Sequence, residues 1–209
     1  MTDAPKGRDL WLAGGQELLR RGGIGAVKLQ ALTDELGLTT GSFYHHFHGM
    51  ADYLDQLARH YGSDQPRIGL AAADDPDPRT RLHKLYALSL DDRMGPLDSA
   101  MRDWAGSNEL AAQAVHDSDE SLLRFIERAF LDLGYPERAA QTRAALLYSA
   151  GVARIRPPWR IGAHAFAETL EVLAPSDAPP PQTMSVGRRP KPRAKRPASS
   201  AVRSQSKMT

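Results

Sequence analysis

Alanine and leucine dominate the apolar residues of this chain of 209 residues. Together they number 55, whereas valine and isoleucine together number only 11. Strands favour β-branched side chains, and helices favour Ala and Leu. The ratio therefore predicts an all-α protein. The chain has no cysteine, which excludes a disulfide framework, a thiol nucleophile and a Cys-ligated zinc site.

Charge divides the chain into an acidic body and a basic tail. Residues 188–209 carry eight basic groups and no acid, which leaves 19 of the 27 basic residues against all 25 acids elsewhere. Seven of the 15 prolines follow Ala174. A segment this poor in large apolar residues cannot offset its ordering entropy, so we expect 175–209 to be disordered. No apolar run is long enough to cross a membrane and no signal-like start is present, so we expect a cytoplasmic protein.

The most informative stretch is 28–47, where two short amphipathic segments, 28–36 and 40–47, are predicted to be helices. A left-handed Gly37 suits a tight helix exit, and Thr39 can cap the second helix with its hydroxyl. This is the layout of a helix-turn-helix, whose second helix enters the DNA major groove.

The second of these helices has two distinct faces. Phe43 and Phe47 lie one turn apart and are expected to face the core. The opposite face then presents Thr40, Gly41, Tyr44 and His45. A glycine inside a helix costs about 1 kcal/mol, and close approach to a DNA backbone would explain Gly41.

The sequence Leu38-Thr-Thr-Gly-Ser-Phe-Tyr-His-His-Phe47 resembles the recognition-helix signature of the tetracycline-repressor (TetR) family of bacterial regulators. The resemblance extends upstream to Trp11, Gly23 and 32–37, and downstream to Tyr53-Leu54. It implies phosphate contacts for Thr39 and Tyr44, with Thr40, Ser42 and His45 near base edges or phosphates. The predicted DNA-binding residues are Lys28, Thr39, Thr40, Gly41, Ser42, Tyr44 and His45.

Three positions depart from the family pattern. Lys28 stands where the family usually has a capping Thr, so the cap is lost while a cation is gained. Met50 replaces a phosphate-binding Lys. Gly14-Gly15 replaces a small Ala pair and should weaken the first helix.

By the resemblance, the chain comprises a DNA-binding domain at 1–49 and a helical regulatory and dimerisation domain at 50–174. A helix at 50–73, kinked at Pro66, would link them. A later helix from about Ser107 is expected to bend near 116–117, where Asp117 and Glu120 have the spacing of a capping box.

Two further residue sets follow for the second half. Residues that could line an effector cavity are Tyr86, Trp104, His116, Phe125 and Tyr148, although each alone is more simply explained by core packing or solvation. The resemblance implies that helices 136–155 and 160–174 pair across a two-fold axis. Small and apolar residues compatible with that interface are Ala140, Ala144, Leu147, Gly151, Phe166, Leu170 and Leu173.

Other functions find less support. No serine elbow, phosphate loop or paired catalytic carboxylates point to an enzyme. His45, His46 and His48 do not share one helix face, so neither a metal nor a cofactor is expected. The sequence predicts a homodimeric transcriptional regulator that acts as a repressor and that a small-molecule effector releases from operator DNA. The alternative is a helix-turn-helix protein without such a ligand, of an architectural or partner-controlled type.

Overall fold

The computed structural model describes residues 7–89, 94–152 and 165–176. All regular structure in these ranges is helical, which confirms the predicted all-α class. None of the described helices is both long and apolar enough to cross a bilayer. In chain order the elements are α1 (Arg8–Gly22), a 3₁₀ turn (Ile24–Ala26), α2 (Leu29–Leu36), α3 (Thr40–His46), α4 (Met50–Arg59), a π-turn (His60–Asp64), α5 (Gln65–Ala73), α6 (Pro78–Ser89), α7 (Met94–Ala105), α8 (Glu109–Asp132), α9 (Glu137–Val152) and α10 (Ala165–Leu173).

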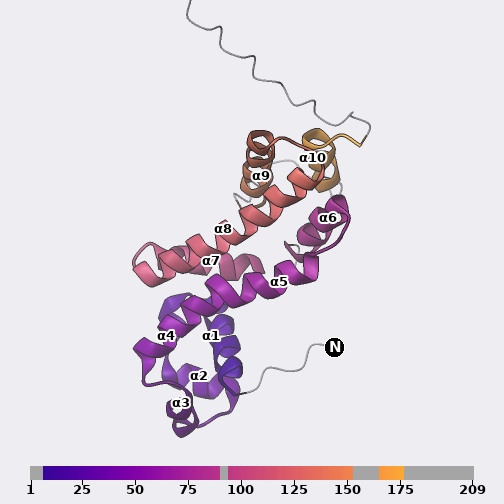
Figure 1. Cartoon of the computed structure of the whole chain (residues 1–209). Coiled ribbons are helices and arrows are strands. Elements are labelled where there is room, and N and C mark those ends of the chain that lie inside the picture. Colours follow the sequence, from indigo (N-terminus) through magenta and orange to yellow (C-terminus); the bar gives the residue numbers. More distant parts are fainter. Residues whose placement is uncertain (1–6, 90–93, 153–164, 177–209) are drawn as a thin grey trace, which may run out of the picture.

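The helices form an elongated molecule with a small head at one end (Figure 1). Helices α1 to α4 make up the head, and α3 lies at its tip. Helices α9 and α10 lie at the opposite end. The rod formed by α4 and α5 and the long helix α8 connect the two ends. The tail beyond residue 176, for which disorder is predicted, lies outside the described residues.

The linker helix expected at 50–73 is a nearly continuous helical rod with one interruption. The π-turn separates α4 from α5 and lies directly before Pro66. Proline has no backbone N–H, so it cannot donate the α-helical bond to the carbonyl of Gly62. The widened turn instead lets the N–H of Gln65 bond to the carbonyl of His60. The structure thus has a π-turn at the predicted kink.

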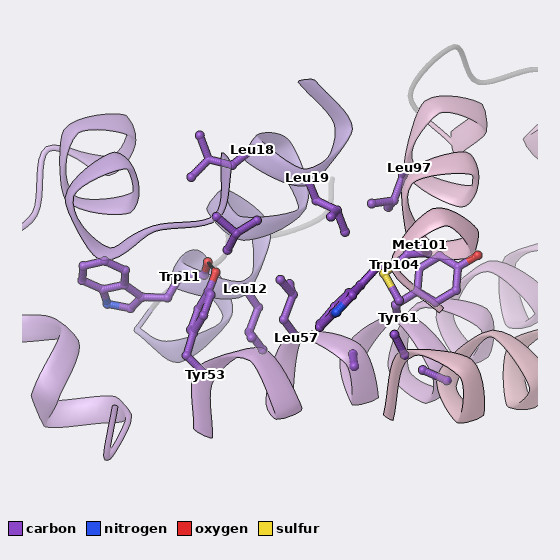
Figure 2. Packing of buried hydrophobic residues seen from close by; sticks show 14 of the residues in the cluster. Trp11, Leu12, Leu18, Leu19, Tyr53, Leu57, Tyr61, Leu97, Met101 and Trp104 are labelled. Atoms are coloured by element: carbon purple, nitrogen blue, oxygen red, sulfur yellow. Dashed lines mark hydrogen bonds between the residues drawn. The ribbon is translucent and has the colours of Figure 1, made fainter. Parts of the chain in front are cut away.

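The hydrophobic interior consists of two cores, and the first of them extends across the domain boundary predicted between residues 49 and 50. A first core begins in α1 around Trp11 and continues without a break through Leu57 and Tyr61 to Leu97 and Met101 of α7 (Figure 2). It also takes in the first turns of α8. A second core joins α6, the last turns of α8, α9 and α10. The head is therefore packed directly onto α7 and α8.

Helix α8 runs unbroken over 24 residues. Its N-cap is Asn108, whose side chain accepts a hydrogen bond from the N–H of Ala111 at 2.9 Å. The capping box expected at Asp117 and Glu120 is wrong. Asp117 lies inside the helix, where Gln113 donates a side-chain hydrogen bond to it at 2.7 Å. The N-terminus of α8 lies more than two turns earlier, at Asn108.

Candidate nucleic-acid interface

The turn between α2 and α3 is built from local chemistry. Gly37 ends α2 in the left-handed conformation, with φ 63° and ψ 28°. Thr39 is the N-cap of α3, and its hydroxyl accepts a hydrogen bond from the N–H of Ser42 at 3.2 Å. Both predicted backbone roles are confirmed, and they set the direction in which α3 leaves the turn.

An aromatic cluster fixes the inner face of α3. Phe43 is fully buried and Phe47 is 2% exposed, as predicted. The Phe43 ring meets Trp11 of α1 edge-on, with centroids 5.4 Å apart, and the Phe47 ring meets Tyr53 of α4 at 4.9 Å. Edge-to-face contacts of this kind add to the free energy gained by burial. Helix α3 is thus held against α1 and α4 through its aromatic side.

The outer face of α3 is open. Tyr44 is 57% exposed, and Thr40, Gly41 and His45 are exposed beside it, while Ser42 is half-buried. A Cβ added at Gly41 would find only the Thr39 hydroxyl, at 3.8 Å. Packing within the described part of the chain therefore does not require glycine at position 41.

The cations of the head are mostly paired with its own acids. Arg20 pairs with Glu17 and Arg21 with Glu35. Arg59 of α4 pairs with Asp55 at 2.9 Å. Three of the described cations of the head are therefore held by neighbouring carboxylates.

Two of the positions that depart from the family pattern lie at helix starts. Lys28 precedes α2, is exposed and provides no side-chain cap, as expected. It has no ion pair within the described part of the chain. Met50 opens α4 and packs, half-buried, against the first core. A lysine at position 50 would have to leave that contact to reach a phosphate.

One close contact was not foreseen from the sequence. The buried Tyr53 hydroxyl of α4 donates a hydrogen bond to the carbonyl of Trp11 in α1 at 2.7 Å. It passes so near Gly15 that a Cβ there would lie 1.9 Å from the phenolic oxygen. Burial raises the pKa of Tyr53 well above its usual range. Gly15 thus permits the close packing of α4 against α1. Helix propensity alone had predicted only that the glycines weaken α1.

The five residues proposed to line an effector cavity fall into separate surroundings. Trp104 is 5% exposed and belongs to the first core (Figure 2), and His116 is exposed on α8. Tyr86 stacks on Phe166 of α10, with ring centroids 4.0 Å apart. Phe125 and Tyr148 are half-buried, and Tyr148 packs against the second core.

Most of the residues proposed for the dimer interface are turned inward. Four of them are at most 7% exposed and form part of the chain's own second core: Ala140, Ala144, Leu147 and Leu170. Phe166 and Leu173 pack against the same core. Within one protomer, these side chains therefore contribute to the chain's own core, and Phe166 and Leu173 remain half-buried. The surroundings of Gly151 lie outside the described residues.

The rings of His45 and His46 meet edge-on at 5.0 Å between centroids. No group of three or more metal-ligating side chains is gathered anywhere in the described ranges.

Comparisons with known proteins agree with this geometry. A family model described as "Bacterial regulatory proteins, tetR family" matches residues 12–57, which span α1 to α4. No curated protein sequence matches the chain.

Three solved structures share the fold. A transcriptional regulator from Rhodococcus sp. Rha1 superposes with a TM-score of 0.61 and 18% identity, covering 81% of this chain and 94% of its own. NemR of E. coli in its reduced form gives 0.60 and 16%, over 80% and 92% of the two chains. A TetR family protein from Vibrio parahaemolyticus gives 0.56 and 15%, over 80% and 96%.

Proposed function

We propose that this chain is a DNA-binding transcriptional regulator of the tetR family of bacterial regulatory proteins, whose family model matches residues 12–57. It would act as a homodimeric repressor that a small-molecule effector releases from its operator. The observation that carries this proposal is the open outer face of α3, held rigid by the aromatic cluster behind it. A helix fixed in this way keeps its shape when it enters the major groove.

The outer face offers the groups that such a role needs. Tyr44 and Thr39 would donate hydrogen bonds to phosphates from the two ends of the exposed surface. Thr40 and His45 would lie nearest the base edges, with Gly41 allowing the DNA backbone to approach. Contacts to phosphates fix the register, and contacts to base edges supply sequence preference.

Regulators of this family bind operator DNA as homodimers, and an open face of α9 is the surface we propose for the pairing. Since one side of α9 is buried in the second core, its opposite side is available. Leu146 is 55% exposed there, and small residues flank it at Ala145, Ser149 and Ala150. On α10, Val172 is 80% exposed. Large exposed apolar side chains beside small ones permit two helices to approach closely.

The effector would act by shifting a population of conformations. A ligand that binds better to one position of the linker helix favours that position. Moving the linker changes the spacing of the two heads, which then lose register with half-sites about 34–36 Å apart. We propose that the effector contacts the half-buried aromatic residues between α6, α8 and α9, and Tyr148 above all.

Selection from random DNA tests the DNA-binding proposal. The full-length protein should enrich a two-fold symmetric sequence. Tyr44→Ala should lower affinity for that sequence by about 1–3 kcal/mol, as expected for loss of one good contact. Leu110→Ala is the matched control, because Leu110 is similarly exposed, at 49%, but lies on α8 outside the head. Equal affinities for Tyr44→Ala and the wild type would refute the proposed binding face.

Sedimentation tests the dimer face. Leu146→Glu should convert the dimer to a monomer, since it would place a charge in an apolar contact. Gln141→Glu, at an exposed position of the same helix, adds a charge without removing apolar surface and is the control.

An effector would be recognised as a compound that releases the wild-type protein from the selected DNA and restores expression of a reporter gene behind it.

A further inference from the structure

Two tertiary contacts hold the π-turn of the linker, one with α7 and one with α8. Tyr61 is 5% exposed, and its hydroxyl donates a hydrogen bond to the Asp98 carboxylate of α7 at 2.8 Å. Gly62 lies directly on α8, where an added Cβ would be 2.8 Å from the Cα of Ala114 and 2.9 Å from its carbonyl oxygen. Backbone meets backbone at that point. The π-turn is therefore held by a side-chain hydrogen bond from one residue and by close backbone packing at the next.

The carboxylate that receives Tyr61 is itself held. Arg102, one turn further along α7, donates from Nε to Asp98 at 3.0 Å. Its two terminal nitrogens bind both oxygens of Asp119 on α8, at 3.0 and 2.7 Å. A bidentate arginine–carboxylate pair fixes geometry as well as charge. Asp98 therefore cannot turn away from the linker without disturbing α8.

The chain of contacts ends on α9. The Tyr148 hydroxyl lies 3.5 Å from a terminal nitrogen of Arg102. Burial and the neighbouring Asp119 raise the pKa of Tyr148 to about 12. We use the name polar relay for Tyr61, Asp98, Arg102, Asp119 and Tyr148, which join the linker, α7, α8 and α9.

The relay acts where the linker's own backbone is weakest. Pro66 removes one bond from the α-helical ladder, so contacts with α7 and α8 contribute more to the geometry of the π-turn. Directly after it, Gln65 accepts a hydrogen bond from Gln16 of α1 at 3.0 Å. The head is therefore attached to the linker next to the point that the relay holds.

We propose that the polar relay sets the position of the head relative to the α9 end of the molecule, with Tyr61 and Asp98 as positioning residues for operator spacing. The inference rests on the proposed function, since spacing matters only for a dimer that reads two half-sites. Without the Tyr61 bond, only the packing of Gly62 on α8 would hold the π-turn, and its geometry would be less restricted. The two heads would then accept half-sites at several separations.

The test compares two DNA fragments with the full-length protein. One is the sequence selected from random DNA, and the other carries one extra base pair between its half-sites. Tyr61→Phe removes only the hydroxyl, and Asp98→Asn keeps the shape of the acceptor. Each should lower the ratio of the two affinities by about three- to tenfold, which lies within the net value of an ordinary intramolecular hydrogen bond. Ser63→Ala is the matched control, because its hydroxyl bonds only locally, to the carbonyl of Arg59 at 2.8 Å.

The outcomes separate cleanly. A lowered ratio with unchanged affinity for random DNA supports the relay. If both variants keep the wild-type ratio, or lose affinity for both fragments equally, the residues do not position the head and the inference is refuted. If the wild-type protein selects no sequence at all, the proposed function fails, and the relay's role in operator spacing fails with it.

Discussion

The contact between Gly15 and Tyr53 makes a quantitative prediction about how the head is joined to the linker. Replacing a glycine by alanine inside a helix ordinarily stabilises a protein by about 0.5–1 kcal/mol. Gly15→Ala should do the opposite. The added methyl group would lie 1.9 Å from the Tyr53 phenolic oxygen and 3.0 Å from Cζ. The oxygen cannot rotate away because it is fixed in the plane of the ring.

The ring itself has little freedom to move. Tyr53 is fully buried, and its ring centroid lies 5.5 Å from that of Phe43 and 4.9 Å from that of Phe47. Overpacking at such a site costs about 1–3 kcal/mol. Set against the usual gain, the expected net loss of stability for Gly15→Ala lies between about 0 and 2.5 kcal/mol, centred near 1 kcal/mol.

Removing the hydroxyl tests the cause. Tyr53→Phe alone loses the bond to the Trp11 carbonyl and should cost about 1 kcal/mol. In the double variant, the methyl group added in place of the Gly15 hydrogen occupies the space that the hydroxyl leaves. The loss of stability of the double variant should therefore be smaller than the sum of the single losses by about 1–2 kcal/mol, a coupling typical of residues in direct contact.

Urea denaturation followed by circular dichroism measures all four proteins. The protein concentration must be held constant, because the stability of a dimer depends on it. Gly14→Ala is the control. The three atoms nearest to its Cβ would be side-chain carbons of Leu36, the closest at 2.9 Å, so it should show no coupling to Tyr53→Phe. Additive losses for Gly15→Ala and Tyr53→Phe would refute the steric argument.

Three further predictions concern the head, the tail and the π-turn. Phe47→Ala should unfold the head, since truncating a buried Phe costs about 3–5 kcal/mol; a thermal melt like that of the wild type would contradict this. A chain ending at Ala174 should bind random DNA more weakly and with a shallower salt dependence, because each neutralised phosphate adds about 0.9 to the slope of log K against log[salt]; equal slopes would show that the tail does not touch DNA. Gly62→Ala should destabilise the fold, and Ala114→Gly should not rescue it, because the clash is with backbone atoms as well as with the Cβ of Ala114; full rescue would show that only the Ala114 methyl matters.

The sequence alone was sufficient where a structural role depends on neighbours in the chain. A left-handed turn needs glycine, so Gly37 could be recognised, and a helix start needs a side-chain acceptor, so Thr39 could be too. The spacing of Phe43 and Phe47 also revealed the inner face of α3. The helical fold class and the exposure of Tyr44 were also predicted correctly, because composition and helical spacing are local properties of the sequence.

Tertiary structure alone decided what depends on residues far apart in the chain. Gly15 looked like a flaw in α1 until Tyr53, 38 positions later, was seen to pass beside it. The first core crosses the predicted domain boundary because α7 and α8 pack on the head. This packing joins residues far apart in the chain, so the local sequence pattern could not predict it.

The clearest case is α9. Small and apolar residues occur on both of its sides, with Ala140 and Ala144 on one and Ala145 and Leu146 on the other. Periodicity cannot say which side is covered by the chain itself. The structure buries the first pair against the second core and leaves the second pair exposed, because only the fold determines where α8 lies.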